Sequence, residues 1–361
     1  MSRAEGRAFA ERAPVPSWIV PALVPVSWLY GGAVALRNLA YDRRWLASIR
    51  IDAPVVSVGN LTLGGTGKTP TVIGIATRLL ARGIRPGIAS RGYGRTSRGL
   101  RLVTDGANAP LGPDEAGEEP VLMARNLPGV PIAVAERRID AAREAVRRGA
   151  EIVLLDDGFQ HRSLARDLDI VLVAGGGDMA RQRLFPAGRL REPVSALSRA
   201  DVLVVTRKSA VPGERASASG RFPRLVRLSA EFRPARISGP AGEAFPLDAL
   251  RGVRVVALSA IGNPSAFLAT LGELGADVTA EIRHRDHHRY TSRDFDEALR
   301  ARERENASFV VTTEKDAVRL GAFADAKTPV RVVGISWFPG PGWETVEERI
   351  VSLVRTGKER T

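Results

Sequence analysis

The stretch that most constrains the fold is GNLTLGGTGKTPT, residues 59–71. An apolar run at residues 54–59 leads into it, and a segment with helical spacing, residues 69–83, follows. A buried strand, a glycine-rich loop ending in Gly-Lys-Thr and a helix, in that order, are the setting of a phosphate-binding P-loop. The usual pattern has a glycine five residues before Gly67, where this chain has Thr62. The order of elements nevertheless favours a nucleotide site over a glycine-rich turn without a ligand.

The loop carries the groups that phosphate binding needs. Glycines at 64, 65 and 67 allow backbone N–H groups to point at phosphate oxygens, Lys68 adds a positive charge, and the Thr69 hydroxyl can hold Mg²⁺. The lysine that some deviant P-loops carry before the paired glycines is Leu63 here.

Short runs rich in Val and Ile alternate with amphipathic stretches after residue 50. Continuous apolar runs are typical of strands buried on both faces of a parallel sheet. The predicted fold class is therefore α/β, a doubly wound parallel sheet. The predicted strands are 54–59, 86–90, 151–157, 169–175, 201–206, 253–260, 308–313 and 330–336, and the clearest helices are 69–83 and 138–150.

The chain of 361 residues is long enough for two α/β domains. A polar stretch rich in Ser, Gly and Pro, residues 208–224, interrupts the alternation of strands and helices. We therefore expect a P-loop kinase domain over 51–225, to which residues 1–50 contribute an N-terminal segment, and a smaller α/β domain over 226–361.

Residues 18–36, WIVPALVPVSWLYGGAVAL, form an apolar segment with Arg37, Arg43 and Arg44 close behind it. Its prolines argue against a spanning helix, and its tryptophans and trailing arginines favour a segment lying at an anionic cytoplasmic membrane face. A spanning helix and a buried hairpin are the alternatives.

The net charge of +13 by itself suits nucleic acid, lipid or a phosphorylated substrate. No nucleic-acid-binding signature accompanies that charge, and the absence of cysteine excludes disulfides and thiolate metal sites.

A second element of the phosphate site is EIVLLDDGFQH, an apolar run that ends in Asp156 and Asp157. Carboxylates at the C-terminal end of a strand beside a P-loop are where a magnesium-holding acid stands.

Several stretches together resemble one family, the tetraacyldisaccharide 4'-kinases, which are the lipid A 4'-kinases of Gram-negative bacteria. They are GNLTLGGTGKTP (59–70), SRGYGR (90–95), GEEPVL (117–122), DDGFQHRSLARDLDIV (156–171), FPAGRLREP (185–193), IGNPSAF (261–267), DHHRYT (286–291) and TTEKDAVRL (312–320). The resemblance implies transfer of the γ-phosphate of ATP to the 4'-hydroxyl of a tetraacyldisaccharide 1-phosphate, which gives the bis-phosphorylated lipid A precursor. It also implies a membrane-docking helix, here at 18–41.

The resemblance implies the site residues as well. The nucleotide-binding residues would be Asn60, Thr62, Gly64, Gly65, Thr66, Gly67, Lys68 and Thr69. The Mg²⁺ contacts would be Thr69, Glu119, Asp156, Asp157 and Gln160, with the choice between the two aspartates open.

A carboxylate and a histidine would form the base dyad. The family has aspartate where this chain has Glu118, and His287 is the expected partner, so domain closure would have to assemble the site. Asp114 and Glu115 are a rival carboxylate pair. A divalent metal cluster and an exposed basic loop are the alternatives for the segment that contains His284, His287 and His288.

Other motif residues have less definite roles. Arg91 is a candidate for phosphate or substrate contact, with a surface ion pair as the alternative, and Lys315 and Asp316 have only a structural or interdomain role to suggest.

The leading hypothesis is a membrane-associated kinase that uses ATP and Mg²⁺ on a lipid disaccharide at the cytoplasmic face of the inner membrane. It needs neither nucleic acid nor an obligate protein partner. A P-loop ATPase acting as a partner-binding switch, or a kinase for another sugar, are the alternatives.

Overall fold

The computed structural model describes residues 18–108, 110–175, 179, 182–207, 222–321 and 323–358. The chain forms two compact units. One, here called the P-loop unit, comprises Ala13–Glu231 and Trp337–Thr361, and the other, the second unit, includes Phe232–Ser336. The sequence placed the whole chain after 226 in the second domain, whereas the C-terminal segment groups with the P-loop unit. The polar stretch at the predicted boundary lies largely in residues 208–221, outside the described residues.

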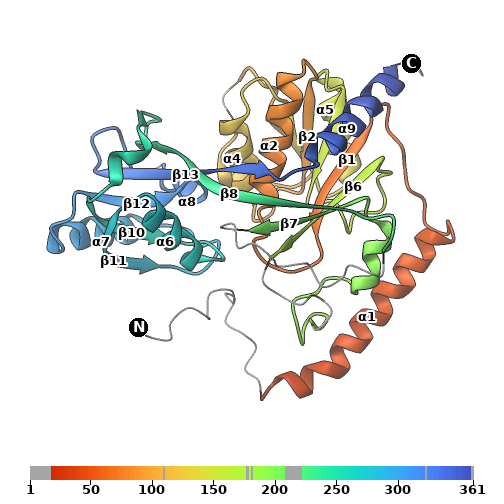
Figure 1. Cartoon of the computed structure of the whole chain (residues 1–361), viewed down its shortest axis with the longest axis horizontal. Coiled ribbons are helices and arrows are strands. Elements are labelled where there is room, and N and C mark those ends of the chain that lie inside the picture. The colour runs from red at the N-terminus through yellow and green to blue at the C-terminus, as the bar shows by residue number, and fades with distance from the viewer. Residues whose placement is uncertain are drawn as a thin grey trace. The chain divides into compact units, whose positions relative to one another are not determined.

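The P-loop unit is built on a largely parallel sheet, as the apolar runs predicted (Figure 1). Its strand order is β8-β7-β6-β1-β5-β2-β4-β3, and only the pairing of β3 with β4 is antiparallel. The bounds are β1 Val55–Asn60, β2 Pro86–Ser90, β3 Arg101–Thr104, β4 Ile132–Val134, β5 Ile152–Asp156, β6 Leu168–Ala174, β7 Val202–Arg207 and β8 Val226–Ser238, the last of which continues into the second unit.

Helices cover both faces of this sheet. Side chains of α5 (Arg138–Arg147) pack with Val153 and Leu155 of β5. Because successive residues of a strand face opposite sides, Leu154 points to the other face. The helix α2 (Lys68–Ala81) also contacts β1 and β5, and salt bridges join it to α9 (Trp343–Lys358). The shorter helices are α3 Pro113–Ala116, α4 Glu118–Asn126 and η2 Val194–Arg199. The prediction of a doubly wound α/β fold is confirmed.

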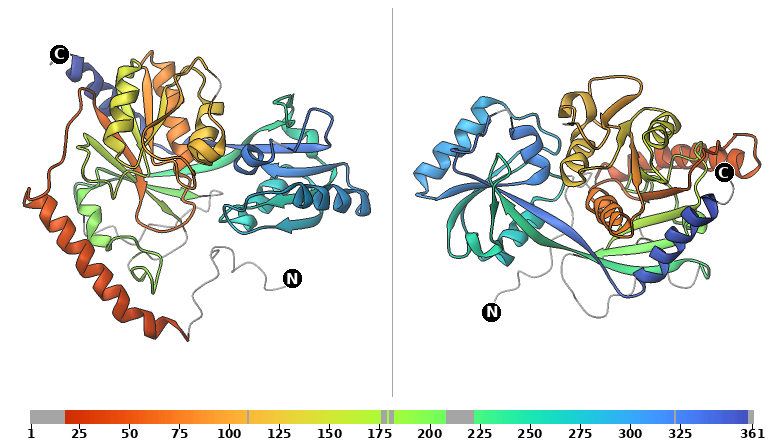
Figure 2. Two further views of the ribbon diagram at one scale, coloured as in Figure 1. Left: turned by 180° about the vertical axis from the view of Figure 1, so that it is seen from behind. Right: turned by 90° about the horizontal axis from the view of Figure 1, so that it is seen from above.

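The apolar N-terminal segment is one continuous helix, α1 (Val20–Asp42), on the outside of the P-loop unit (Figures 1 and 2). Pro21 lies in its first turn, where a missing N–H is tolerated, and Pro25 lies inside it. Its inner side is tied to the loop at 184–192: Tyr30 donates to the Arg191 carbonyl at 2.7 Å and Asn38 to Glu192 at 2.9 Å. A single helix with so few buried residues is not the hairpin considered as an alternative.

The second unit has its own parallel strands, in the order β11-β10-β12-β13. Its core contains Leu271 of α6, Phe295 of α7 and Leu320 of α8. The bounds are β9 Ala244–Phe245, η3 Leu247–Leu250, β10 Arg254–Ser259, α6 Pro264–Glu273, β11 Asp277–Arg283, α7 Ser292–Arg304, β12 Phe309–Thr313, α8 Glu314–Leu320 and β13 Val330–Pro339, whose last residues lie in the P-loop unit.

Candidate active site

The predicted P-loop joins β1 to α2. Gly64 and Gly67 have φ angles of 108° and 80°, which glycine adopts without a Cβ clash. Asn60 is fully buried, and its side-chain amide donates to the Thr62 carbonyl at 2.8 Å and to the Thr66 hydroxyl at 3.0 Å. Asn60 therefore shapes the loop from inside, and Gly65 has open space beside its Cα.

Arg189 braces the same loop, a contact that the sequence did not reveal. Its guanidinium donates to the Leu63 carbonyl at 2.9 Å and 3.2 Å, and its own carbonyl accepts from the Leu63 N–H at 2.7 Å. The guanidinium also lies against Gly64, because a Cβ there would approach it to 2.4 Å. The FPAGRLREP motif thus supports the P-loop directly.

Lys68 and Thr69 begin α2, and both are largely shielded from solvent. The Lys68 ammonium lies 3.6 Å from Asp157 Oδ1, and the Lys68 side chain is 12% exposed. Thr69 is 8% exposed and lies in the first helical turn. The helix start also directs its positive dipole end at the loop, which favours a bound anion.

The two aspartates that end β5 differ sharply in environment. Asp156 is 1% exposed, and its Oδ2 accepts from the Ser90 hydroxyl at 2.9 Å. Its Oδ1 is buried and accepts no hydrogen bond among the described residues. Burial, together with the charges of Glu119 and Asp157, raises the pKa of Asp156 from 3.8 to about 7.

Asp157 turns away from the strand with a φ of 49° and meets two cations. Both of its carboxylate oxygens accept from Arg191, at 3.0 Å and 2.8 Å, in addition to the Lys68 contact. Burial favours a higher pKa for Asp157, but Lys68 and Arg191 outweigh it and hold the pKa below its ordinary value. Asp157 is therefore a carboxylate already paired with the chain's own cations.

Glu118 and Glu119 open α4, where negative side chains suit the helix dipole. Gly117 precedes them with a φ of 88°, and a Cβ there would lie 2.9 Å from the Tyr93 carbonyl. The SRGYGR loop thus packs against the turn that places Glu118. The rival Asp114 and Glu115 lie in α3, and their carbonyls accept from the Thr96 and Ser97 side chains.

Gln160 and His161 follow the aspartates. The Gln160 amide donates to the Asn60 carbonyl at 3.0 Å, so this predicted Mg²⁺ contact also touches the strand that leads into the P-loop. His161 Nε2 lies 3.0 Å from the Ser163 hydroxyl. Burial, followed by the charges of Arg138 and Arg166, lowers the pKa of His161 to about 4, so the ring is neutral at physiological pH.

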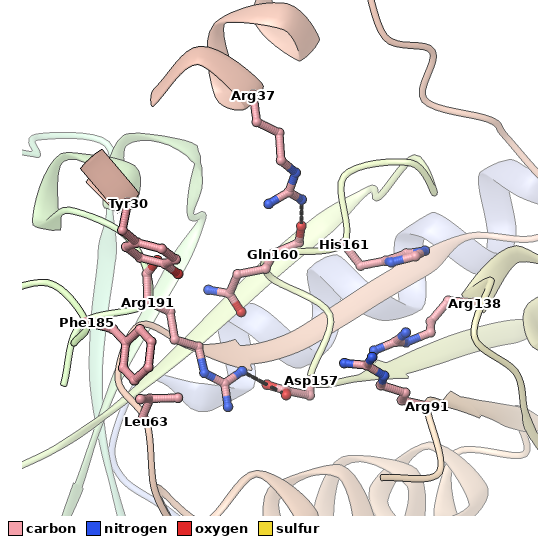
Figure 3. A pocket seen from close by; sticks show the side chains of 10 residues that line it. All are labelled: Tyr30, Arg37, Leu63, Arg91, Arg138, Asp157, Gln160, His161, Phe185 and Arg191. Carbon is pink, nitrogen blue, oxygen red and sulfur yellow. Dashed lines mark hydrogen bonds and ion pairs between the residues drawn. The ribbon is translucent and has the colours of Figure 1, made fainter. Parts of the chain in front are cut away.

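A pocket of about 560 Å³ opens beside these residues (Figure 3). Figure 3 shows Arg91 and Arg138 on one side, Tyr30, Phe185 and Leu63 on the other, and Asp157 with Arg191 between them. The Tyr30 and Phe185 rings pack edge to face, 5.9 Å apart. The lining is Tyr30, Arg37, Leu63, Arg91, Arg138, Asp157, Gln160, His161, Phe185 and Arg191. Cations and apolar rings thus share one cavity next to the predicted phosphate site.

The predicted base histidine, His287, lies in the second unit, on the loop after β11. Its neighbours His284 and His288 form a group with Asp294 whose ligand-type atoms lie within 4.8 Å of one another. However, the two imidazoles are stacked, with ring centres 4.3 Å apart and planes at 7°. Ring-nitrogen lone pairs lie in the ring plane, so two stacked rings do not aim at one ion. The arrangement favours a packed pair over the metal cluster considered as an alternative.

Comparison with known proteins gives one consistent answer. The family model for LpxK, tetraacyldisaccharide-1-phosphate 4'-kinase, matches residues 19–353. A tetraacyldisaccharide 4'-kinase of Anaeromyxobacter sp. (strain K) is 45% identical over 314 residues, covering 85% of this chain and 83% of the relative. The corresponding protein of Syntrophus aciditrophicus is 39% identical over 347 residues, 92% of each chain.

A solved structure agrees with the sequence comparisons. The crystal structure of LpxK from Aquifex aeolicus in complex with ATP has a TM-score of 0.76 and 31% identity, covering 93% of this chain and 99% of that one. The resemblance inferred from the motifs is confirmed, and the chain belongs to the tetraacyldisaccharide-1-phosphate 4'-kinase family.

Proposed function

We propose that this chain transfers the γ-phosphoryl group of ATP to the 4'-hydroxyl of a tetraacyldisaccharide 1-phosphate, giving the bis-phosphorylated lipid A precursor. One observation carries the proposal: within one unit, Asp157 connects the P-loop lysine with a pocket lined by arginines and apolar rings. Asp157 contacts Lys68 and Arg191, and it also lines the pocket. A nucleotide phosphate site and an acceptor site for an anionic amphiphile are thereby adjacent.

The residues around Asp156 fit a divalent cation. Asp156 offers a buried carboxylate oxygen without a hydrogen bond among the described residues, in a group whose pKa is raised to about 7, and a divalent cation would stabilise its charged form. We assign Asp156, Thr69 and Glu119 to Mg²⁺, directly or through water, with Gln160 beside them. When bound, Mg²⁺ neutralises charge on the β- and γ-phosphates. Asp157 is instead assigned to hold Lys68 and Arg191, whose cations face the charge that develops on the transferring group.

The arginine side of the pocket suits the phosphate of the acceptor. Arg91 and Arg138 lie together there, and a guanidinium recognises phosphate through paired N–H groups. Tyr30, Phe185 and Leu63 give the opposite wall an apolar character that suits a sugar ring and the first carbons of acyl chains. Neutral His161 contributes hydrogen-bonding capacity without repelling the arginines.

We assign Glu118 and His287 to the proton of the acceptor hydroxyl. In the proposed reaction the 4'-oxygen forms a bond to the γ-phosphorus, the bond from that phosphorus to the bridging oxygen of ADP breaks, and Glu118 takes the hydroxyl proton. Support comes from the placement of Glu118 by Gly117 and from the family's carboxylate–histidine pattern. Glu118 retains the acid–base chemistry of the aspartate that the family uses.

We propose that α1 holds the enzyme at the cytoplasmic face of the inner membrane, as a peripheral or monotopic protein. Among the described residues, α1 is the one helix that is long and apolar enough to cross a membrane. One side of it is bound to the 184–192 loop, whereas its Trp28 and Leu29 are 72% and 76% exposed. A helix bound to protein on one side and apolar on the other suits the membrane interface.

Vesicle binding tests this location. We expect Trp28→Ser/Leu29→Ser to weaken binding to vesicles containing phosphatidylglycerol by at least tenfold, because each buried apolar side chain contributes roughly 1.5–3 kcal/mol. Leu80→Ser, an exposed leucine on α2, is the matched control and should bind like wild type. Equal binding by the double variant would remove α1 from the membrane contact.

The activity itself is tested by transfer of labelled phosphate from ATP to tetraacyldisaccharide 1-phosphate in detergent micelles. Wild type should form the bis-phosphorylated product only with Mg²⁺, Lys68→Ala should form none above background, and Lys327→Ala should match wild type. ATP hydrolysis without lipid product would favour the partner-binding switch. Transfer to a soluble sugar alone would identify a different acceptor.

A further inference from the structure

The TTEKDAVRL motif ends in a short helix, α8, that lies against the loop carrying His287. Lys315 and Arg319 are four residues apart and therefore lie on the same side of this helix. Lys315 Nζ is 3.7 Å from Asp286 Oδ1, and Arg319 contacts both His287 and His288. One side of α8 thus faces the DHH segment.

Asp316, also on α8, ties this helix to the segments on either side of the histidine loop. It is fully buried, its Oδ1 accepts from the Ala260 N–H at 3.1 Å and from the Tyr290 hydroxyl at 3.3 Å, and its Oδ2 accepts from Thr313 at 2.7 Å. These bonds connect α8 to the end of β10 and to the far end of the histidine loop. The buried aspartate therefore fixes α8 relative to His287.

His287 itself has an unusual backbone. Its φ angle is 63°, in the left-handed region, which a residue with a Cβ rarely adopts because the Cβ crowds the following carbonyl oxygen. Hydrogen bonds hold it there: its N–H donates to the Ala260 carbonyl at 3.3 Å, and Arg319 donates to the His288 carbonyl at 2.7 Å. A strained backbone that the surroundings hold in place is typical of a functional position.

The decisive contact joins Arg319 Nη2 to His287 Nδ1, 3.3 Å apart. A guanidinium has only donors, so Nδ1 must be the acceptor, and in the neutral ring the proton is then on Nε2. We propose that Arg319 is a positioning residue that fixes the Nε2–H tautomer of His287. His287 then enters the reaction as a hydrogen-bond donor through Nε2 rather than as the group that takes the proton.

The surroundings of Nε2 agree with a donor. Asp286 Oδ1 lies 3.8 Å from His287 Nε2, beyond hydrogen-bond range, and 3.7 Å from Lys315 Nζ. A carboxylate oxygen on this side of the ring agrees with a proton on Nε2. This role rests on the proposed function, in which Glu118 takes the hydroxyl proton.

The tautomer can be measured without any activity assay. Full-length protein labelled with ¹⁵N-histidine contains four histidines, and His287→Gln identifies the signals of His287 in long-range ¹H–¹⁵N spectra. Wild type should show a protonated Nε2 and an unprotonated Nδ1. Arg319→Met should give a mixture or the opposite tautomer, and Arg319→Lys, which keeps a donor, should retain the wild-type pattern. Arg304→Met removes an exposed arginine of α7 and serves as the matched control.

Kinetics give the second readout. Arg319→Met should lower kcat roughly 100-fold with little change in the KM for ATP, because misplacing a reacting group by about 1 Å costs that much, and Arg319→Lys should recover part of the loss. A protonated Nδ1 in wild type, or a ring pattern that Arg319→Met leaves unchanged, would overturn the assignment. If the ring depends on Arg319 but no lipid is phosphorylated, the proposed function fails and the assignment of the tautomer stands.

Discussion

Asp157 accepts two hydrogen bonds from Arg191, at 2.8 Å and 3.0 Å, on the same carboxylate that lies 3.6 Å from the Lys68 ammonium. The neighbouring Asp156 is buried, and its Oδ1 accepts no hydrogen bond among the described residues. Two consecutive aspartates thus have different surroundings: Asp157 is hydrogen-bonded to a guanidinium of the chain, whereas Asp156 is hydrogen-bonded to the Ser90 hydroxyl. The choice between them as the Mg²⁺ ligand, which the sequence leaves open, can be decided by experiment.

We expect Asp156→Asn to raise the Mg²⁺ concentration needed for ATP binding by at least tenfold, since it removes a charged ligand. Asp157→Asn should leave that concentration within about threefold of wild type and lower kcat roughly 100- to 1000-fold, because Lys68 and Arg191 lose their anchor. Mg²⁺ titrations of nucleotide binding, followed by thermal shift, separate the two effects. The reverse ranking of the two variants would make Asp157 the metal ligand.

The raised pKa of Asp156 predicts how stability depends on pH. Its pKa moves from 3.8 to about 7, mainly through burial, so the folded chain binds this proton more tightly than the unfolded chain does. Its contribution to the free energy of unfolding is therefore complete below about pH 4 and is lost as the pH rises to about 7. In nucleotide-free and metal-free protein, we expect Asp156→Asn to have a Tm several degrees above wild type at pH 8 and a smaller advantage at pH 5.

The comparison of the two Tm values at each pH cancels the other titrating groups. Asp167→Asn, which removes a partly exposed aspartate paired with Arg50, serves as a control for the loss of a carboxylate. A difference between Asp156→Asn and wild type that does not change from pH 5 to pH 8 would mean that Asp156 does not titrate in this range.

The pocket predicts how the acceptor's phosphate is recognised. Arg91 is exposed at the rim and lies beside Arg138 (Figure 3). We expect Arg91→Gln to raise the KM for tetraacyldisaccharide 1-phosphate about tenfold while the KM for ATP stays within twofold, because a charge-assisted hydrogen bond contributes about 1.5–3 kcal/mol. Arg98→Gln, in the same loop, should behave like wild type.

An acceptor that lacks the 1-phosphate sharpens this test. If Arg91 binds that phosphate, Arg91→Gln and wild type should have nearly equal KM values for the dephosphorylated acceptor, because the interaction is already missing. An undiminished difference between the two enzymes would assign Arg91 to another part of the sugar.

The sequence predicted those parts of the fold that depend on local patterns. Every strand predicted from a short apolar run formed, because burial on both faces demands uninterrupted Val and Ile. The three-residue β4 and the partly exposed β11, with its mixed sequence DVTAEIR, give no such signal. The return of α9 to the P-loop unit brings Glu347 into ion pairs with the distant Arg78 and Arg82, and no local pattern contains these contacts.

The site shows the same limit. A P-loop and a strand that ends in acidic residues are recognisable sequence motifs, so the sequence alone singles out Lys68, Thr69, Asp156 and Asp157. The different surroundings of Asp156 and Asp157 could not be predicted, since they follow from Arg191, which reaches Asp157 only in the folded chain. Likewise, nothing in TTEKDAVRL states that Arg319 contacts an imidazole. That contact requires both the helix and the left-handed turn at His287.

Glu118 provides the last prediction, because the motif resemblance implies an aspartate where this chain has glutamate. We expect Glu118→Gln to lower kcat roughly 100- to 10,000-fold, the range that a positioned general base contributes, with little change in the KM for ATP. Glu118→Asp should retain measurable activity, because the carboxylate survives and moves by about one carbon–carbon bond length. Glu115→Gln, on the adjacent α3, is the matched control and should keep wild-type kcat. Initial rates of lipid phosphorylation between pH 6 and pH 9 measure all three variants.

Wild-type activity of Glu118→Gln together with a large loss in Glu115→Gln would transfer the base role to α3. Equal activity in all variants would mean that the hydroxyl loses its proton without help from either carboxylate.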